Sequence, residues 1–458
     1  MKKITLLLLA ALAAMPVLAQ DIDEEARRSA RQAETEKRSE KAAAEASDRK
    51  PLEGAGSVTY EDVLAQPDNV ELNYRWAKKQ VEAGDIKGAS ATLERILMVK
   101  PGLTRIRLTY AVILYRLDNM AEARRELELV KAQSSGAVRA EAEEYLARVE
   151  KRTRLTHFHG TLGVGYQYDD NRNAGPASHQ RLFRGTALNL ATGRATDDTS
   201  VLMLAGFGVR RDLRGPLAKA LFADLNYYRA EQTNLDTLDL QAYSFAAGAE
   251  FKLGRLTVTP TALADHIRLS EETYLRTRGG RLRFDRRLNK RMAVHAIAQV
   301  LVNDHIRTTD IPTATERTGT ESTLRGGASL VVAPTQRVAA EYGYQQKDAR
   351  KMYIAYDRHS LALTHTWLIG GGRFLLSGLG IDRDRYAAPD LVIASAERAD
   401  DRARVHLTIG QPLGFLGKLF EPMLLTAGYE YLHVNSNILN YAYTNNKVNT
   451  MLIYRWDH

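Results

Sequence analysis

The sequence contains no cysteine among its 458 residues. That absence excludes disulfide bonds, thiolate metal sites and cysteine nucleophiles, and it suits an exported protein that stays unfolded until it reaches its membrane. After residue 19 there is also no uninterrupted apolar run of about 18 residues, so no membrane-spanning helix is expected. GxSxG, HExxH, phosphate-loop and dinucleotide-binding motifs are missing as well. The sequence therefore predicts no enzyme, no catalytic residue, no metal site and no cofactor.

Residues 1–19 have the three parts of a secretory signal peptide. Lys2 and Lys3 form the charged start, an apolar run follows, and Val17-Leu18-Ala19 offers small residues for cleavage. Residues 20–58 are rich in Ala, Glu, Arg, Lys and Ser with almost nothing to bury, which predicts a charged linker without stable structure. The net charge of +9 suits anionic partners. Export argues against nucleic acid and favours outer-membrane lipid, lipopolysaccharide or an acidic client protein.

A repeat with helical apolar spacing occupies the next region, which we bound at 59–152. Five residue pairs share an offset of 34, namely Trp76 with Tyr110, Ala77 with Ala111, Ala89 with Ala123, Leu93 with Leu127, and Ile96 with Val130. This is tetratricopeptide spacing, in which small residues let paired helices approach and large ones fill the gap. A last helix near 137–151 is expected to cap the stack. The apolar residues are interpreted as core, and client binding is expected on the concave face of this domain, with no individual residue predicted.

From residue 155 to 458 the apolar pattern changes to period two, as in strands whose faces meet different surroundings. In the first candidate strand, Leu162, Val164, Tyr166 and Tyr168 share one face. Segments of about ten residues, apolar outward and polar inward, predict a transmembrane antiparallel β-barrel. A soluble barrel or sandwich is the alternative. The last candidate strand keeps five residues on one face, namely Val448, Thr450, Leu452, Tyr454 and Trp456.

Short turns and longer polar connections alternate along this region. The turns are expected near 212–219, 253–255, 289–290, 333–337, 369–373 and 414–421, and the longer external loops near 232–237, 306–320, 348–357, 385–401 and 435–447. About fifteen candidate strands would put the two ends of the barrel on opposite sides of the membrane. The candidate at 182–193 is therefore assigned to a long first external loop, which leaves about fourteen strands.

An arginine-rich strand is a candidate for lumen selectivity. If Leu282 and Phe284 face lipid, the alternation directs Arg281, Arg283, Asp285 and Arg287 into the lumen. Charge there could select what passes, or it could form a structural network with lumen carboxylates such as Asp265 and Glu341. Arginines and lysines at the outer rim could instead bind lipopolysaccharide.

A second candidate site is the oxygen-rich segment after the first strand. It contains Asp169, Asp170, Asn171 and Asn173. Calcium accepts such ligands, but a polar loop turn is the favoured interpretation.

This segment also carries a family resemblance. Residues Gly163 to Pro176, GVGYQYDDNRNAGP, are a Gly-rich strand followed by Tyr-Asp-x-Asn-x-Asn. Together with the leader, the tetratricopeptide region and the barrel, the motif resembles the surface lipoprotein assembly modulator family. The chain departs from the usual aromatic C-terminal residue by ending Trp456-Asp457-His458. Otherwise its last strand resembles the signal recognised by the barrel-assembly machinery.

The resemblance implies an outer-membrane translocator with its helical domain in the periplasm. Such a protein delivers clients, which are surface lipoproteins or soluble secreted proteins, from the periplasm to the cell surface. Two alternatives remain. A tetratricopeptide-porin exporter of polysaccharide usually has a longer helical array, and a cationic polymer would require an acidic lumen rather than the arginine-rich strand at 276–287. A small-solute porin would leave the helical domain unexplained.

Overall fold

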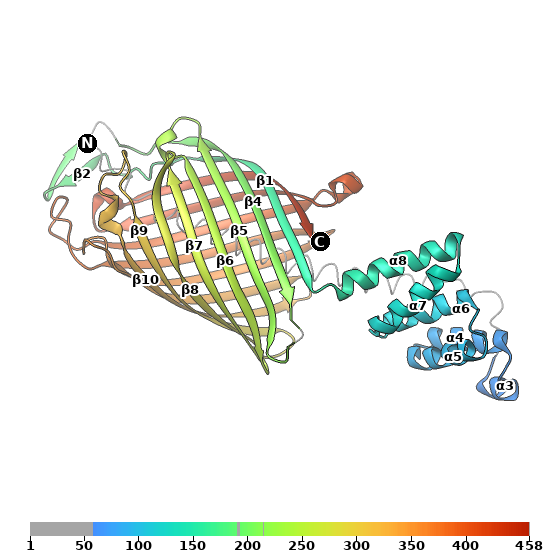
Figure 1. The fold of residues 1–458 in the computed structure, drawn as a ribbon. Helices are drawn as coiled ribbons and strands as arrows, with labels where there is room; N and C mark the ends of the chain where they lie inside the picture. Colours follow the sequence, from blue (N-terminus) through green and yellow to red (C-terminus); the bar gives the residue numbers. More distant parts are fainter. Residues whose placement is uncertain (1–57, 190–192, 214, 458) are drawn as a thin grey trace. The chain divides into compact units, whose positions relative to one another are not determined.

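A computed structural model describes residues 58–189, 193–213 and 215–457. The predicted signal peptide and nearly all of the predicted linker lie outside the described residues. The described chain divides into two compact units, one made of helices and one that forms a barrel (Figure 1). In the described ranges, no helix has both the length and the apolar character needed to cross a membrane.

The helical unit consists of antiparallel helix pairs. Its described helices are α3 (Tyr60–Ala65), α4 (Val70–Glu82), α5 (Ile86–Val99), α6 (Thr104–Arg116), α7 (Met120–Gln133) and α8 (Gly136–Thr153). Helix α3 starts at a capping box, because the Thr59 side chain accepts from the Asp62 amide and Asp62 in turn accepts from the Thr59 amide. Helices α4 and α5 form one pair, α6 and α7 form the next, and α8 packs on α7. The predicted cap helix thus extends slightly beyond 137–151.

The repeated residues form the core of this unit. Ala77, Ala89, Ala111 and Ala123 are at most 2% exposed, so the paired helices approach closely at these positions. The large residues of the repeat, Leu93, Leu127, Ile96, Val130 and Tyr110, fill the space between the helices. Trp76 is half-buried beside Tyr60, with ring centroids 6.0 Å apart. The tetratricopeptide prediction is therefore confirmed at the level of packing.

The second unit is a closed barrel of fourteen antiparallel strands, as predicted. The strands are β1 (Thr156–Asp169), β4 (Asp198–Asp212), β5 (Ala218–Gln232), β6 (Leu240–Leu253), β7 (Leu256–Leu269), β8 (Glu272–Arg287), β9 (Met292–His305), β10 (Gly319–Ala333), β11 (Gln336–Lys347), β12 (Tyr356–Gly370), β13 (Arg373–Tyr386), β14 (Ala399–Pro412), β15 (Met423–Ser436) and β16 (Tyr443–Asp457). Strands β2 (Gln180–Phe183) and β3 (Thr186–Asn189) pair only with each other, in the first loop. The assignment of the candidate at 182–193 to a loop is therefore confirmed for its described residues.

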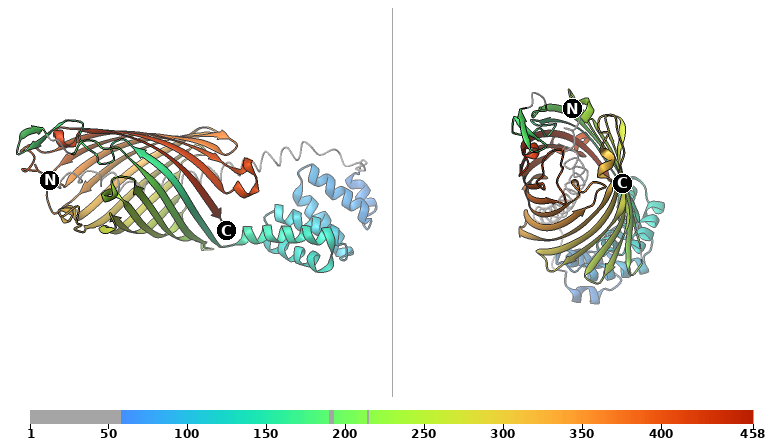
Figure 2. Two further views of the ribbon diagram at one scale, coloured as in Figure 1. Left: turned by 90° about the horizontal axis from the view of Figure 1, so that it is seen from above. Right: turned by 90° about the vertical axis from the view of Figure 1, so that its left-hand side faces the viewer.

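The two ends of the barrel differ in the length of their connections (Figure 2). One end, the short-turn end, carries the start of β1, the end of β16 and most of the tight turns, and the other, the loop end, carries the long connections. One tight turn at the loop end, between β7 and β8, was not predicted. Ser270 and Glu271 alone join β7 to β8, with φ angles of 48° and 65°. No glycine marks this turn, so its tightness has no signal in the sequence.

The barrel closes where β1 meets β16, and we call this contact the seam. His159 lies opposite Asp457 at one end of the seam and Asp169 lies opposite Lys447 at the other. Gly160 is required near the short-turn end, because a Cβ atom there would lie 1.8 Å from a ring carbon of Trp456. Gly165 makes a second close contact in the seam, because a Cβ atom there would lie 2.4 Å from the carbonyl oxygen of Thr450. The seam is thus a regular antiparallel pair with close contacts at two glycines.

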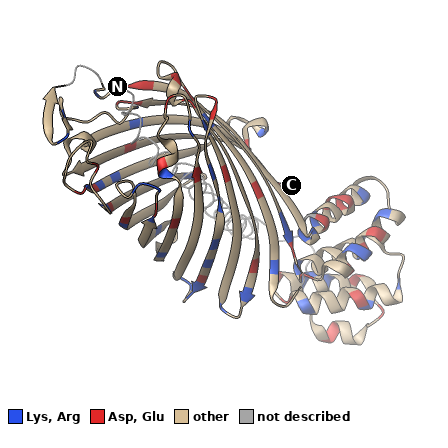
Figure 3. Ribbon diagram, turned by 60° about the vertical axis from the view of Figure 1, so that its left-hand side comes forward, with Lys and Arg blue, Asp and Glu red and all other residues tan. Residues whose placement is uncertain are grey.

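The outer face of the barrel is apolar. Along β1, Leu162, Val164 and Tyr166 are each about half exposed, at 51%, 51% and 52%. The same outward row on β16 contains Val448, Leu452, Tyr454 and Trp456. Along the strands, charged residues occupy positions between the outward apolar ones or lie toward the strand ends (Figure 3). An apolar outer band flanked by aromatic residues is what a transmembrane barrel needs, because lipid surrounds it on every side.

Candidate functional site

The lumen face of β8 carries the predicted arginine-rich row. Leu282 and Phe284 pair with Pro260 and Val258 on the outer face, so Arg281, Arg283, Asp285 and Arg287 lie on the opposite, inner face. Arg283 binds Asp285 through two hydrogen bonds, of 2.8 Å from Nε and 3.0 Å from Nη2. This pair is bidentate and only partly exposed, so it fixes the position of the Arg283 guanidinium on the lumen wall.

Of the two predicted lumen carboxylates, Glu341 has partners on neighbouring strands. Glu341 on β11 lies 2.7 Å from Nε2 of His295 and 3.5 Å from Nη1 of Arg325. These groups come from β9, β10 and β11, next to β8 in the barrel. One wall of the lumen therefore carries a band of arginine and histidine interleaved with carboxylates.

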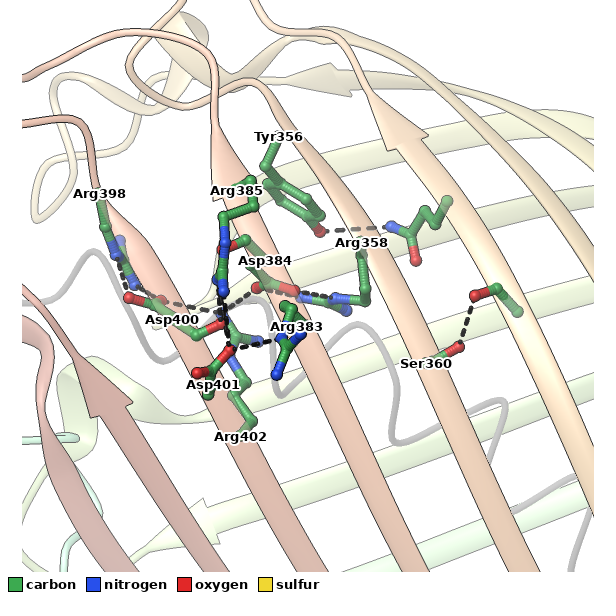
Figure 4. Close-up of polar contacts among 12 residues, drawn as sticks. Tyr356, Arg358, Ser360, Arg383, Asp384, Arg385, Arg398, Asp400, Asp401 and Arg402 are labelled. Carbon is green, nitrogen blue, oxygen red and sulfur yellow. Dashed lines mark hydrogen bonds and ion pairs between the residues drawn. The ribbon is translucent and has the colours of Figure 1, made fainter.

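A second charged cluster lies on the inner face of β12, β13 and β14 toward the loop end (Figure 4). We call it the arginine–aspartate ladder, and it consists of Arg358, Asp384, Arg402, Asp400 and Arg398. Arg358 binds both carboxylate oxygens of Asp384, at 2.6 and 2.9 Å, and Arg402 binds the same carboxylate at 2.8 Å. Arg402 lies 3.5 Å from Asp400, which Arg398 also binds through two nitrogens.

The ladder is buried among aromatic rings. Both of its carboxylates are fully buried. The guanidinium of Arg398 stacks over Tyr441 at 3.6 Å and over Tyr386 at 4.5 Å, and Arg358 lies 4.9 Å from the centroid of Tyr356. Burial raises the pKa of Tyr441, which lies in the loop between β15 and β16, to about 12, so its phenol is neutral at ordinary pH. The ladder joins three strands and two loops into one rigid part of the wall.

The sequence-based prediction missed the ladder, and it assigned two of the five members, Arg398 and Asp400, to the loop at 385–401. In the structure β13 continues to Tyr386 and β14 begins at Ala399. The signal was present as charges at alternate positions, Asp382 and Asp384 before the loop and Asp400, Arg402 and Arg404 after it. Such alternation indicates the inner face of strands that continue beyond the apolar belt.

The oxygen-rich segment after β1 forms a compact turn that contacts β16. Asp169 is 2% exposed, lies 3.9 Å from Lys447 and 3.9 Å from Arg172, and accepts from the Asn171 amide at 3.2 Å. Asn171 donates to the carbonyls of Gly175 and Thr444, both at 2.9 Å, and accepts from the Gly175 amide at 2.7 Å. These bonds hold the turn against the last strand.

Two further residues of the motif complete this contact. The carboxylate of Asp170 accepts from the backbone amide and the side chain of Asn446, at 2.7 and 2.6 Å. Asn173 donates to the Arg194 carbonyl at 2.7 Å and accepts from the Thr196 amide at 3.0 Å. We call the set of Asp169, Asp170, Asn171 and Asn173 the first-loop clasp. The structure brings all four together, and their oxygens and nitrogens are engaged by protein groups across the seam and within the first loop.

An apolar core lies inside the loop end of the barrel. Its wall is made of inward-facing residues of β4 to β8, β15 and β16, and it is covered by residues from three loops. The loop residues are Ala174 from the first loop, Leu238 from the second, and Ile311 and Ala314 from the connection between β9 and β10. We call this cluster the loop-end core. The sequence analysis placed candidate charges in the lumen and predicted no apolar cluster, but on this side of the loop end apolar side chains pack together inside the barrel.

A cluster on the helical unit combines two aromatic rings with two arginines. Tyr115 on α6 and Tyr145 on α8 meet edge to face with centroids 5.9 Å apart. Arg152 lies 5.4 Å from the ring centroid of Tyr115, and Arg148 lies 4.8 Å from that of Tyr145. Both rings are half-buried and both arginines are exposed. The cluster combines aromatic surface with positive charge, and the sequence-based prediction did not name its residues.

Known proteins are similar to separate parts of this chain. Residues 82–141 match the model of a tetratricopeptide repeat family. Among solved structures, OmpT of Vibrio cholerae shares 10% identity with a TM-score of 0.39, covering 66% of this chain and 97% of that chain. The outer membrane channel DcaP of Acinetobacter baumannii shares 10% identity with a TM-score of 0.36, covering 66% of this chain and 97% of that chain. A structure described as a bacterial polysaccharide outer membrane secretin shares 8% identity with a TM-score of 0.35, covering 65% of this chain and 98% of that chain. No curated protein sequence matches the chain.

These scores are low, so the class of the protein rests on its own topology and surface. The chain combines a tetratricopeptide region with a closed barrel of fourteen strands whose outer face is apolar. It is an outer-membrane β-barrel protein with an N-terminal tetratricopeptide domain.

Proposed function

We propose that this protein is a translocator that delivers client proteins, either surface lipoproteins or soluble secreted proteins, from the periplasm to the cell surface. The observation that carries the proposal is the direct fusion of a peptide-binding scaffold to a membrane barrel. Helix α8 ends at Thr153 and β1 begins at Thr156, so only Arg154 and Leu155 separate them. A protein bound by the repeats is therefore tethered to the barrel by a very short connection, which a plain solute channel does not need.

The orientation follows from the connections. Short turns of outer-membrane barrels normally face the periplasm and long loops face the exterior. The chain of the helical domain enters the barrel at the short-turn end, so the helical domain would lie in the periplasm. Clients would be received there and released at the loop end.

The cluster of Tyr115, Tyr145, Arg148 and Arg152 is our candidate for the client contact. Exposed guanidinium groups beside aromatic rings suit a client segment that carries both acidic and aromatic side chains. Arg148 and Arg152 already pair with Glu144 at 2.6 Å and Asp118 at 2.9 Å. An acidic client segment would exchange these exposed pairs for its own, at little cost because exposed pairs stabilise weakly.

Passage through the barrel requires an unfolded client. The interior of a barrel of about fourteen strands is too narrow for a folded domain, because diameter grows with strand number. The loop-end core also has to open, since Ile311 and Ala314 are fully buried against the lumen wall. Folding of the client outside the cell would drive the transfer, and no hydrolysis step is required.

The proposal is tested by proteomics of protein released from the surface of intact cells by protease, with and without this gene. The expected result is the loss of one or a few proteins from the surface while they persist in the periplasm. An unchanged protein surface together with altered glycan export or solute uptake would refute the proposal and support an exporter or a porin.

A variant extends the test to the helical domain. Reversing charge at Arg148 and Arg152, as R148E/R152E, is expected to reduce surface delivery of the same proteins at least several-fold while the barrel is still inserted. Arg139 is the matched control, because it lies on the same helix, is exposed and has a similar pair with Glu143 at 3.2 Å. Equal delivery by R148E/R152E and R139E would exclude this cluster as the client contact.

A further inference from the structure

Two arginines of β8 face outward, toward lipid. Arg276 is in register with His266 on β7 and Asp304 on β9, and Arg278 is in register with Ala264 and Val302. Val302 is 40% exposed on the outer face, and both arginines are exposed on that same face. They are separate from the lumen-facing arginines of the same strand, which occupy the odd-numbered positions.

Three other outward-facing arginines near the loop end have acidic partners. Arg229 binds Glu231 at 2.5 Å, and Arg383 and Arg385 bind Asp401 at 3.2 and 3.3 Å. In the part of the chain that the structure describes, neither Arg276 nor Arg278 forms an ion pair. A cation on the lipid-facing side needs a counter-charge, because the surrounding medium solvates it poorly.

A third arginine and a histidine extend this patch. Arg268 lies one row closer to the loop end on β7, where it donates to the side chain of Gln241 at 3.2 Å and to the carbonyl of Glu271. Both acceptors are neutral groups, an amide side chain and a backbone carbonyl, so Arg268 has no counter-charge among these bonds. His266 lies in the same row as Arg276, next to the row of Arg268, and its Nε2 is 3.4 Å from the hydroxyl of Thr273. The acidic groups nearby are Asp304, in register with Arg276, and Glu271 at the turn.

The position of the patch corresponds to the boundary between apolar belt and headgroups. Tyr243 is in register with His266 and contacts it with ring centroids 6.2 Å apart, and Tyr227 lies 5.0 Å from Tyr243. Tyrosines gather at such interfaces because their rings are apolar and their hydroxyls are wet. Arginine is destabilising at the middle of the lipid face of a barrel but is tolerated near the interface. The long side chains of Arg276 and Arg278 can therefore extend toward the headgroups.

We propose that Arg268, Arg276 and Arg278 form a binding site for the phosphate groups of a phosphorylated glycolipid in the outer leaflet, of the lipid A type. Guanidinium groups pair with phosphate in a bidentate manner, which supplies both charge and geometry. Arg276 and Arg278 are two residues apart on one strand, or about 6.6 Å, so one phosphate can contact both. The acyl chains of the same lipid would cover the apolar surface below, formed by Val300, Val302 and Leu324. The site is independent of client transfer and depends only on the barrel spanning the outer membrane.

The test is binding of purified full-length protein, in detergent, to bisphosphorylated lipid A, measured by native mass spectrometry and by the thermal shift of the barrel. The R276Q/R278Q variant is expected to bind at least about tenfold more weakly, since it loses charge-assisted hydrogen bonds. The matched control is R286Q, because Arg286 lies on the same strand and the same outward face but near the short-turn end. R286Q is expected to bind lipid A as the wild type does. Heat-modified migration in gels verifies that each variant forms a folded barrel.

Three probes identify the ligand chemistry. Dephosphorylated lipid A is expected to bind the wild type as weakly as bisphosphorylated lipid A binds the double variant. Inorganic phosphate at millimolar concentration is expected not to displace lipid A, because it lacks the acyl contacts. Equal binding of lipid A by wild type and R276Q/R278Q would overturn the proposal. If the wild type bound dephosphorylated lipid A as tightly as bisphosphorylated lipid A, the proposal would also be overturned, in favour of apolar contact alone. If it bound phosphatidylglycerol as tightly, the proposal would be overturned in favour of a general anionic lipid site.

Discussion

Replacing Asp384 by asparagine should destabilise the barrel strongly, although the change preserves the size and shape of the side chain. Asp384 is fully buried, accepts two hydrogen bonds from Arg358 at 2.6 and 2.9 Å, and forms an ion pair with Arg402 at 2.8 Å. The asparagine would leave Arg358 and Arg402 side by side with one carboxylate, Asp400, 3.5 Å from Arg402. Removing one partner from a buried charge network costs about 3–5 kcal/mol, because the remaining charges are desolvated and uncompensated.

The neighbouring aspartate provides the control. Asp401 also binds two arginines, Arg383 at 3.2 Å and Arg385 at 3.3 Å, but its side chain is 48% exposed on the outer face. The D401N variant should therefore cost less than about 1 kcal/mol. The two variants make the same chemical change one strand apart, so the difference between them isolates the effect of burial.

The measurement is urea-induced unfolding of the full-length protein in lipid vesicles, followed by tryptophan fluorescence, to which Trp367 on β12 and Trp456 on β16 contribute from the barrel. The midpoint of unfolding for D384N should move to a much lower urea concentration than that for D401N, with an unchanged slope. A D384N protein as stable as D401N would refute the reasoning. It would mean that water reaches the ladder and screens the two arginines.

Further predictions concern the helical core and the clasp. Leu93 is fully buried between the first two repeat helices, so L93A should cost about 2–5 kcal/mol of stability. Exposed Met98 on the same helix is the control, and M98A should change stability by less than about 0.5 kcal/mol, with both variants followed by thermal loss of the circular dichroism of the helices. The N171A variant removes three hydrogen bonds that tie the first loop to itself and to Thr444. It should make the first loop more sensitive to external protease in intact cells, and unchanged protection would show that the rest of the clasp is sufficient.

Much of the fold could be predicted because it depends on periodicity. The helical repeat was visible in small residues such as Ala89 and Ala123, since only small side chains permit the close approach that the structure has at these positions. The strands were visible because lipid and lumen impose opposite polarity on alternate residues. The even strand number followed from the need to return the chain to the end of the barrel where it starts.

The parts that could not be predicted depend on contacts between distant segments. The ladder brings together Arg358, Asp384 and Asp400 from three strands, and no pattern within one strand indicates such pairing. The loop-end core was hidden for the same reason, because Ile311 looks like an ordinary loop residue until the loop folds into the lumen. For the motif after β1, the sequence indicated a polar turn but not its bonds to Asn446 and Thr444, which are about 270 residues away in the chain.

The seam between β1 and β16 also determines the order in which the barrel can be completed. Every strand pair apart from the seam joins two strands that follow one another along the barrel. Each of those pairs can form as soon as both of its strands are available. Strand β1 gains its second partner only when the last residues, up to Asp457, have arrived. Until then β1 and the latest strand keep unpaired backbone edges, which in other settings recruit further strands and aggregate. Closure is thus a single late event that uses the most distant pairing in the molecule, and the first-loop clasp can form only after it.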